Sequence, residues 1–94
     1  MPYSLARLKV EDYAKWKLVF DAIAPARKAS GGAIKGTLFQ DVDNPNEVTV
    51  LIEWDTLENA HKFIPSEAIK KALMESGVIK SDFYYLNEVE PVKV

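Results

Sequence analysis

The segment from Glu47 to Trp54 alternates between two kinds of side chain, and it constrains the fold more than any other stretch. Every second side chain is large and apolar, namely Val48, Val50, Ile52 and Trp54. A period of two predicts a β-strand that lays one face on a core. The stretch 41–46 before it, Asp-Val-Asp-Asn-Pro-Asn, is typical of a turn. The segment 34–40 is therefore expected to pair with 47–54 in a hairpin.

A helix is predicted between the first strand and this hairpin. Apolar residues recur there at three- and four-residue spacing, which gives a helix one apolar face. Asp12 suits the positive end of the helix dipole. Pro25 lacks a backbone N–H, so the helix should kink or break near Ala24. The pair Gly31-Gly32 should end it.

A second helical region follows the hairpin and begins with a capping sequence. In Asp55-Thr56-Leu57-Glu58, Asp55 or Thr56 caps the helix and Glu58 reaches back to the cap. This helix meets Pro65. A further helical segment over 67–75, capped by Ser66, should end at Gly77.

Alternating segments at both ends complete the pattern. We expect strands over 3–10 and 82–90, the second ended by Pro91. The order is then β-α-β-β-α-β, a ferredoxin-like arrangement of the α+β class with a four-stranded antiparallel sheet and helices on one face. We treat residues 1–94 as one domain.

The apolar content exceeds what this arrangement buries by itself. Hydrophobic residues are 48% of the chain. The sheet face away from the helices carries Leu51 and, depending on register, either Phe83 with Tyr85 or Tyr84 with Leu86. Leaving four such side chains in water would forfeit roughly 6–12 kcal/mol, comparable to the whole stability of a small domain. We therefore expect a homodimer that packs two sheets face to face and encloses a cavity.

Composition excludes several classes of function. The net charge is −2, with no cysteine and one histidine. A basic footprint for nucleic acid is absent, as is the run of about 18 apolar residues that a membrane span needs. Disulfides, thiolate metal sites and multi-histidine metal cages are excluded. We expect no metal and no cofactor. Residues 1–4 lack the layout of a signal peptide, which favours the cytoplasm.

Several short motifs lie between residues 12 and 63, within a likeness that covers roughly residues 8–90. They are Asp12-Tyr13-x-x-Trp16-Lys17, Phe20-Asp21, Pro25-x-Arg27-Lys28-x-x-Gly31, Asp43-Asn44-Pro45-Asn46-x-Val48, Glu53-Trp54-Asp55 and Ala60-x-x-Phe63. Together they resemble the antibiotic biosynthesis monooxygenase-like family of the dimeric α+β barrel superfamily. The resemblance implies a dimeric α+β barrel. It also implies a cofactor-independent monooxygenase or polyketide cyclase that acts on a flat, hydrophobic small molecule.

The same superfamily contains haem-degrading oxygenases. Those enzymes use an asparagine on the first strand, a tryptophan where the third strand ends and a histidine late in the second helix. Trp54 stands at the tryptophan position. The first strand has no asparagine, and Leu73 stands near the histidine position. The resemblance therefore disfavours haem degradation.

Glu53 and His61 are the candidate catalytic residues. Glu53 points away from the face that carries Trp54, and a desolvated carboxylate there could act as acid or base. It could equally pair with Arg7 or a lysine across the sheet. His61 is an imidazole suited to proton transfer, but its helical phase also fits a boundary position beside solvent. In the oxygenase interpretation one of them deprotonates the substrate, and in the cyclase interpretation it enolises a polyketide.

Five residues are candidates for substrate binding: Trp54, Tyr13, Tyr84, Tyr85 and Arg7. Trp54 could stack on a flat substrate, although its place in the alternating strand fits a core residue better. The tyrosines are pocket candidates because their hydroxyls need partners. Arg27 and Lys28 could bind an anionic group, but a solvated charge pair is the favoured interpretation. Strand register decides whether Glu53 or Trp54 faces the cavity.

Two other functions stay open. The chain could be a non-catalytic dimeric module whose cavity holds a small ligand or is simply filled. Removal of Met1 would expose Pro2, and an N-terminal proline is the base of tautomerases, which is the least favoured reading. The residues leave open whether the chain is an enzyme at all.

Overall fold

The computed structural model describes residues 1–29 and 31–94. Its strands are β1 (Pro2–Val10), β2 (Ala33–Gln40), β3 (Glu47–Trp54) and β4 (Val78–Asn87). Its helices are α1 (Tyr13–Ala22), α2 (Ala24–Ala29), α3 (Leu57–Phe63) and α4 (Glu67–Glu75). The order confirms the predicted β-α-β-β-α-β pattern, with each α unit made of two helical segments. None of the helices within these ranges is long and apolar enough to cross a membrane.

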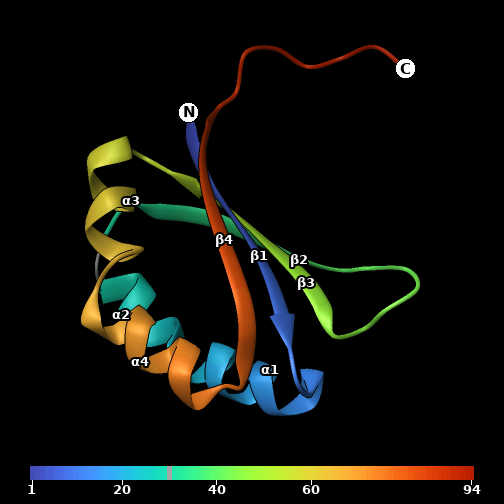
Figure 1. Ribbon diagram of the computed structural model, residues 1–94. Coiled ribbons are helices and arrows are strands. Elements are labelled where there is room, and N and C mark those ends of the chain that lie inside the picture. Colours follow the sequence, from blue (N-terminus) through green and yellow to red (C-terminus); the bar gives the residue numbers. More distant parts are fainter. Residues whose placement is uncertain (30) are drawn as a thin grey trace.

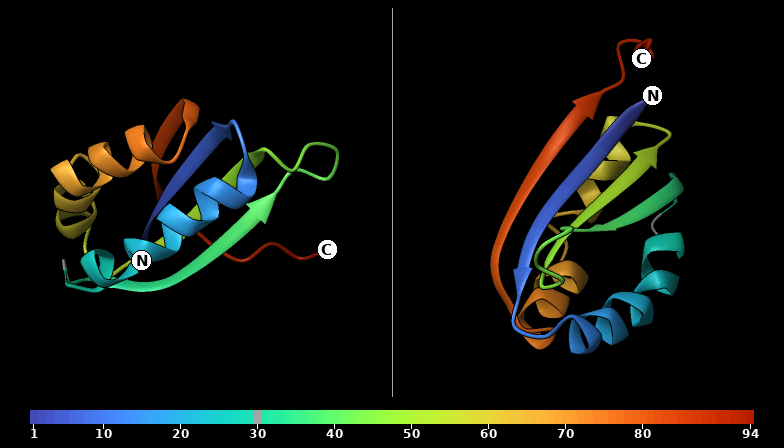
Figure 2. Two further views of the ribbon diagram at one scale, coloured as in Figure 1. Left: turned by 90° about the horizontal axis from the view of Figure 1, so that it is seen from below. Right: turned by 90° about the vertical axis from the view of Figure 1, so that its right-hand side faces the viewer.

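The strands form an antiparallel sheet in the order β2-β3-β1-β4, as predicted for the ferredoxin-like class. The first strand lies inside the sheet, with β3 on one side and β4 on the other. All the helices lie on one face of the sheet, and the other face is uncovered (Figures 1 and 2). We call the uncovered face the open face. Beyond β4 the chain leads away from the sheet (Figure 1).

The first α unit breaks where the sequence predicts. Asp12 is the N-cap of α1, and its side chain accepts a hydrogen bond from the Ala14 N–H at 3.1 Å. The helix ends at Ala22, and α2 begins at Ala24 with Pro25 in its first turn. Proline is tolerated there because the first N–H groups of a helix have no partner within it. The break between Ala22 and Ala24 therefore separates two helices, and the helical region continues through α2.

The second α unit is capped by Thr56, one of the two predicted caps, but the predicted contact from Glu58 back to the cap is wrong. Thr56 is the N-cap and accepts from the Asn59 N–H at 3.2 Å. Glu58 does not reach back but pairs with Lys62 at 3.2 Å. With Thr56 as the cap, the third helical position is Asn59, and its side-chain amide donates to Asp55 at 2.9 Å. This hydrogen bond is the main reason that the pKa of Asp55 is lowered.

The last strand begins and ends earlier than predicted. β4 runs from Val78 to Asn87, whereas the alternation indicated residues 82–90. Gly77, at φ 76°, lets the chain turn straight from α4 into the sheet, so the strand starts at once. At the other end Asn87 pairs with Pro2, the first residue of β1, and the partner strand ends there.

Register assigns the two faces of the sheet. Trp54 lies on the helix face, is 0% exposed, and donates its indole N–H to Ser4 at 2.9 Å. On the open face Leu5 pairs with Leu51 in β3 and with Tyr84 in β4. The pair that faces away from the helices is therefore Tyr84 with Leu86. Phe39 is also on this face and is 50% exposed.

Candidate functional site

A cavity of about 70 Å³ lies between the helix face of the sheet and the helices. We call it the inner cavity. Its lining is almost entirely apolar, from strands β1, β3 and β4 and from all of the helices. The aromatic residues in the lining are Trp16, Phe20, Phe63 and Phe83, and the polar ones are Arg27 and Ser76. Such a site excludes water and favours an apolar ligand.

Aromatic residues on α1 form one wall. Trp16 and Phe20 are four residues apart, so their rings lie on the same side of the helix. The rings stack at 4.8 Å between centroids with 22° between their planes. Trp16 is buried, and Phe20 is packed against the core. Together they offer a flat surface to the cavity.

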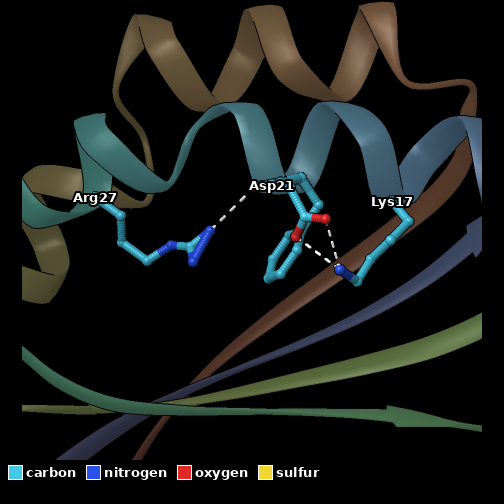
Figure 3. A network of polar contacts seen from close by, with 4 residues as sticks. Lys17, Asp21 and Arg27 are labelled. Atoms are coloured by element: carbon cyan, nitrogen blue, oxygen red, sulfur yellow. Dashed lines mark hydrogen bonds and ion pairs between the residues drawn. The ribbon is translucent and has the colours of Figure 1, made fainter.

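Arg27, on α2, is the charged residue of the lining. Its guanidinium carbon lies 4.5 Å from the centroid of the Phe20 ring, and one amino group donates to the Phe20 carbonyl at 3.3 Å. Burial lowers the pKa of Arg27, opposed by the charge of Asp21. Asp21 itself accepts from Lys17 with both carboxylate oxygens at 2.7 Å (Figure 3). The fold thus holds a half-buried cation beside an apolar space.

A second space adjoins the inner cavity near the β2 edge of the sheet. It has a volume of about 190 Å³, and we call it the outer groove. Arg27 and Ile52 line both spaces. Lys28 and Lys35 line the outer groove as well. Arg27 therefore borders both an apolar cavity and a groove with basic side chains.

The two predicted catalytic residues lie on opposite sides of the sheet. Glu53 is on the open face and accepts a hydrogen bond from the Tyr3 hydroxyl at 3.3 Å. Tyr3 also hydrogen-bonds Glu88 at 3.0 Å, and this contact is the main cause that raises the pKa of Tyr3 to about 12. His61, on α3, is exposed and meets the ring of Tyr85 edge-on at 4.3 Å. Neither Glu53 nor His61 lines the inner cavity.

The predicted substrate-binding residues are dispersed. Trp54 packs against Phe63, with 5.8 Å between ring centroids, and its indole N–H donates to Ser4. Tyr13 stands at the start of α1, 5.9 Å from the ring of Trp16. Tyr84 is on the open face, so it is separated by the sheet from Tyr85. These positions bring His61 and Tyr85 together but assemble no common pocket.

Arg7 belongs to a different depression. It lines a broad groove of about 540 Å³ on the open face, near the β2–β3 turn. The groove holds basic residues, including Lys9 and Lys80, and acidic ones, including Glu47 and Asp82. The register places Arg7 opposite Thr49 and Asp82 rather than beside Glu53. This groove is polar and open, unlike the inner cavity.

The residue that the sequence interpretation undervalued is Arg27. It was expected in a solvated charge pair, but it is half-buried against Phe20. Its backbone N–H donates to the Ile23 carbonyl at 3.0 Å, so helical spacing continues across the break at Pro25. Arg27 therefore follows Phe20 by two helical turns on the same face. The spacing of seven residues between Phe20 and Arg27 is the sequence signal that indicates this contact.

No protein-family model and no curated protein matches the sequence. Solved structures match along nearly its whole length. SnoaB from Streptomyces nogalater, a cofactor-independent oxygenase, is 14% identical, with a TM-score of 0.83 over 97% of this chain and 95% of that one. A Deinococcus radiodurans protein provisionally named an antibiotic biosynthesis monooxygenase is 18% identical, with a TM-score of 0.79 over 100% and 98%. A conserved protein from Methanosarcina mazei is 18% identical, with a TM-score of 0.76 over 94% and 92%.

These similarities define the class of fold. The chain has a ferredoxin-like α+β fold of the kind found in antibiotic biosynthesis monooxygenase-like proteins. The resemblance that the sequence motifs indicated is thereby confirmed at the level of the fold. Function is a separate matter, because one fold supports many activities.

Proposed function

We propose that this protein binds a flat, apolar small molecule in the inner cavity and oxidises it with dioxygen, without a cofactor. The observation that carries the proposal is the apolar, aromatic-walled cavity with Arg27 at its boundary. The fold shared with SnoaB, itself a cofactor-independent oxygenase, supports the same kind of chemistry. A substrate of this kind supplies the electrons itself, so the protein has only to bind, orient and polarise it.

A polycyclic phenol or its keto tautomer, such as anthrone, illustrates the reaction. Loss of a proton leaves an electron-rich anion that reacts with dioxygen. In the overall balance the ring methylene exchanges two hydrogens for one oxygen atom, and the other oxygen atom leaves in water. A fixed positive charge beside a cavity of low polarity stabilises that anion. Arg27 would supply this charge, and the stacked rings of Trp16 and Phe20 would orient the substrate.

Glu53 and His61 remain our candidates for the proton acceptor. His61 lies outside the inner cavity on the helix side of the sheet, so the substrate would have to extend beyond the cavity to reach it. Glu53 lies on the open face, so it would act only on a substrate that is bound on that face. The variants Glu53→Gln and His61→Ala test the two roles separately. A base that acts directly is expected to contribute roughly 10²–10⁴ to the rate. Full turnover in both variants would remove both residues from the mechanism.

We further propose that the protein acts as a homodimer through the open face. Leu5, Leu51, Tyr84 and Leu86 form an apolar strip across β3, β1 and β4 on that face. Tyr84 and Leu86 are 48% and 43% exposed. Packing the strip against a second copy removes this surface from water, which is the strongest general force for association.

A second candidate function, a non-catalytic small-ligand-binding module, has its own support. Among the described residues that line the inner cavity, Arg27 is the one ionisable group. An arginine stays protonated at neutral pH and is a poor general base. The volume of 70 Å³ is also below the roughly 300 Å³ of ordinary ligand pockets. A protein can bind a small ligand in such a cavity without catalysing a reaction.

Oxygen uptake with anthrone, in metal- and flavin-free buffer, tests the proposal. We expect uptake above the rate without protein. The variant Ala72→Leu fills the inner cavity and should abolish the excess, whereas Ala68→Leu, an exposed position on the same helix, should keep it. Anthrone binding that Ala72→Leu weakens, without oxygen uptake, would favour the binding module. Absence of both binding and uptake would refute the use of this cavity.

A further inference from the structure

We propose that Arg27 makes this site selective for an aromatic carboxylate, with the ring in the inner cavity and the carboxylate beside the guanidinium in the outer groove. This inference rests on the proposed use of the inner cavity and adds the charge of the ligand. It concerns recognition, so it holds for an oxygenase and for a binding module alike.

The first support is position. Arg27 lines both the inner cavity and the outer groove, and so does Ile52 from the sheet below. The two residues therefore mark the place where the spaces meet. A ligand with an apolar end and a charged end would pass its apolar end inward at this place. Its charged end would then lie within reach of Arg27.

The second support is the sign of the charge. The charged residues that line either space, among those the structure describes, are Arg27, Lys28 and Lys35, and all are cationic. The nearby acid, Asp21, binds Lys17 and also acts on Arg27 through its charge, but it lines neither space (Figure 3). A neutral ligand would make no use of this arrangement. An anion would complement it and would recover the solvation that Arg27 loses on burial.

The third support is geometry. The guanidinium is held by the Phe20 ring on one face, at 4.5 Å, and by the Phe20 carbonyl, at 3.3 Å. A guanidinium fixed in this way loses little freedom when it binds a ligand. Its planar set of N–H donors matches two carboxylate oxygens better than a single charged point does. This feature favours a carboxylate among anionic groups.

Size limits the apolar part of the ligand. The inner cavity, at about 70 Å³, is smaller than the roughly 150 Å³ apolar cavity known to bind benzene. It can accept the edge of a ring system, and the remainder would lie against Arg27 and Ile52. The outer groove, at about 190 Å³, gives room for the rest of the ligand and its carboxylate.

The test compares two probes of the same shape, 2-naphthoate and the neutral 2-naphthamide, by isothermal titration calorimetry. Wild-type protein should bind naphthoate at least about tenfold more tightly, since hydrogen bonds to charged groups contribute that much or more. The variant Arg27→Gln should lose this preference through weaker naphthoate binding, with naphthamide changed less than about twofold. The variant Lys70→Gln removes the same charge from an exposed site on α4 and should keep the preference.

Arg27→Met is the second variant, because its unbranched stem can still cover the Phe20 ring if the glutamine variant folds poorly. Lost preference in either folded variant supports the proposal. Equal binding of both probes to wild type, or a preference that survives in both variants, overturns it while leaving the proposed cavity intact. If neither probe binds at millimolar concentration, both this inference and the proposed use of the inner cavity fail. Loss of the preference in Arg7→Gln instead would move the anion site to the open face and also overturn it.

Discussion

The hydrogen bond between Trp54 and Ser4 gives the sharpest test of how the core is built. Trp54 is 0% exposed and Ser4 is 4% exposed, and the indole N–H donates to the serine hydroxyl at 2.9 Å. We expect Ser4→Ala to leave that N–H buried without an acceptor. An unsatisfied buried donor costs about 1–3 kcal/mol. For a domain of this size each kcal/mol lowers Tm by about 4–8 °C.

A double-mutant cycle separates this hydrogen bond from packing. Trp54→Phe removes the donor and part of the ring, and it leaves the Ser4 hydroxyl without its partner. In that background Ser4→Ala should cost little, because nothing remains for the hydroxyl to accept. The two changes should therefore couple by at least about 1 kcal/mol.

The assay is urea denaturation of the four proteins, followed by circular dichroism. Additive effects, or a Ser4→Ala variant as stable as wild type, would show that the indole N–H is satisfied in another way. The cycle also bears on function. If Trp54 is a core residue, the folded Trp54→Phe variant should bind naphthamide as wild type does. A variant of full stability with lost binding would return Trp54 to the ligand site.

Three further predictions concern the open face, the Tyr3 cluster and the glycine turn. Light scattering should show a dimer for wild type and a monomer for Leu51→Glu. The control Leu18→Glu, at a position on α1 that is 74% exposed, should leave the dimer unchanged. A monomeric wild type would refute the interface. The hydrogen bond to Glu88 is the main cause that raises the pKa of Tyr3 to about 12. Its stabilisation of the folded state is therefore fully present below the unfolded pKa near 10, and it is lost as pH rises toward 12. Tyr3→Phe should remove the latest phase of an ultraviolet tyrosine titration and flatten the fall in stability over that window; a titration without a late phase would contradict this. Gly32→Ala should destabilise the protein more than Gly31→Ala. A Cβ added at Gly32 would lie 2.5 Å from an Asp55 oxygen, whereas a Cβ added at Gly31 meets nothing within 4 Å. Equal melting temperatures of the two variants would refute the reasoning.

Much of the fold follows from local sequence signals. The strand over 47–54 has the predicted bounds, because alternation and turn chemistry agree at both of its ends. The break before Pro25 and the stop at Gly77 follow from backbone properties that no tertiary contact overrides. The end of β4 could not be predicted in this way. It depends on where the partner strand β1 begins, because Asn87 pairs with Pro2, which is far from it in the sequence.

The candidate site was harder to predict for a similar reason. Composition draws attention to scarce groups such as His61, but scarcity does not say which side of the sheet a residue occupies. Glu53 and His61 are eight positions apart, yet the sheet separates them. From the sequence, Arg27 and Lys28 after the proline kink are better interpreted as a solvated charge pair. Its burial depends on the stacked Phe20 ring, a contact made across the helix break.

The place of β1 in the sheet has a consequence for how the protein is made. This strand precedes β3 and β4 in the chain, yet it lies between them, and its residue Pro2 pairs with Asn87. During synthesis β1 therefore meets its second partner only after β4, which ends at Asn87, has left the ribosome. Pairings so distant in sequence slow folding and prolong exposure to aggregation. A circular permutant that joins the present ends and opens the chain in the 41–46 turn would place β1 directly after β4 but would move β2 and β3 to opposite ends, so the late pairing would pass from β1 with β4 to β2 with β3.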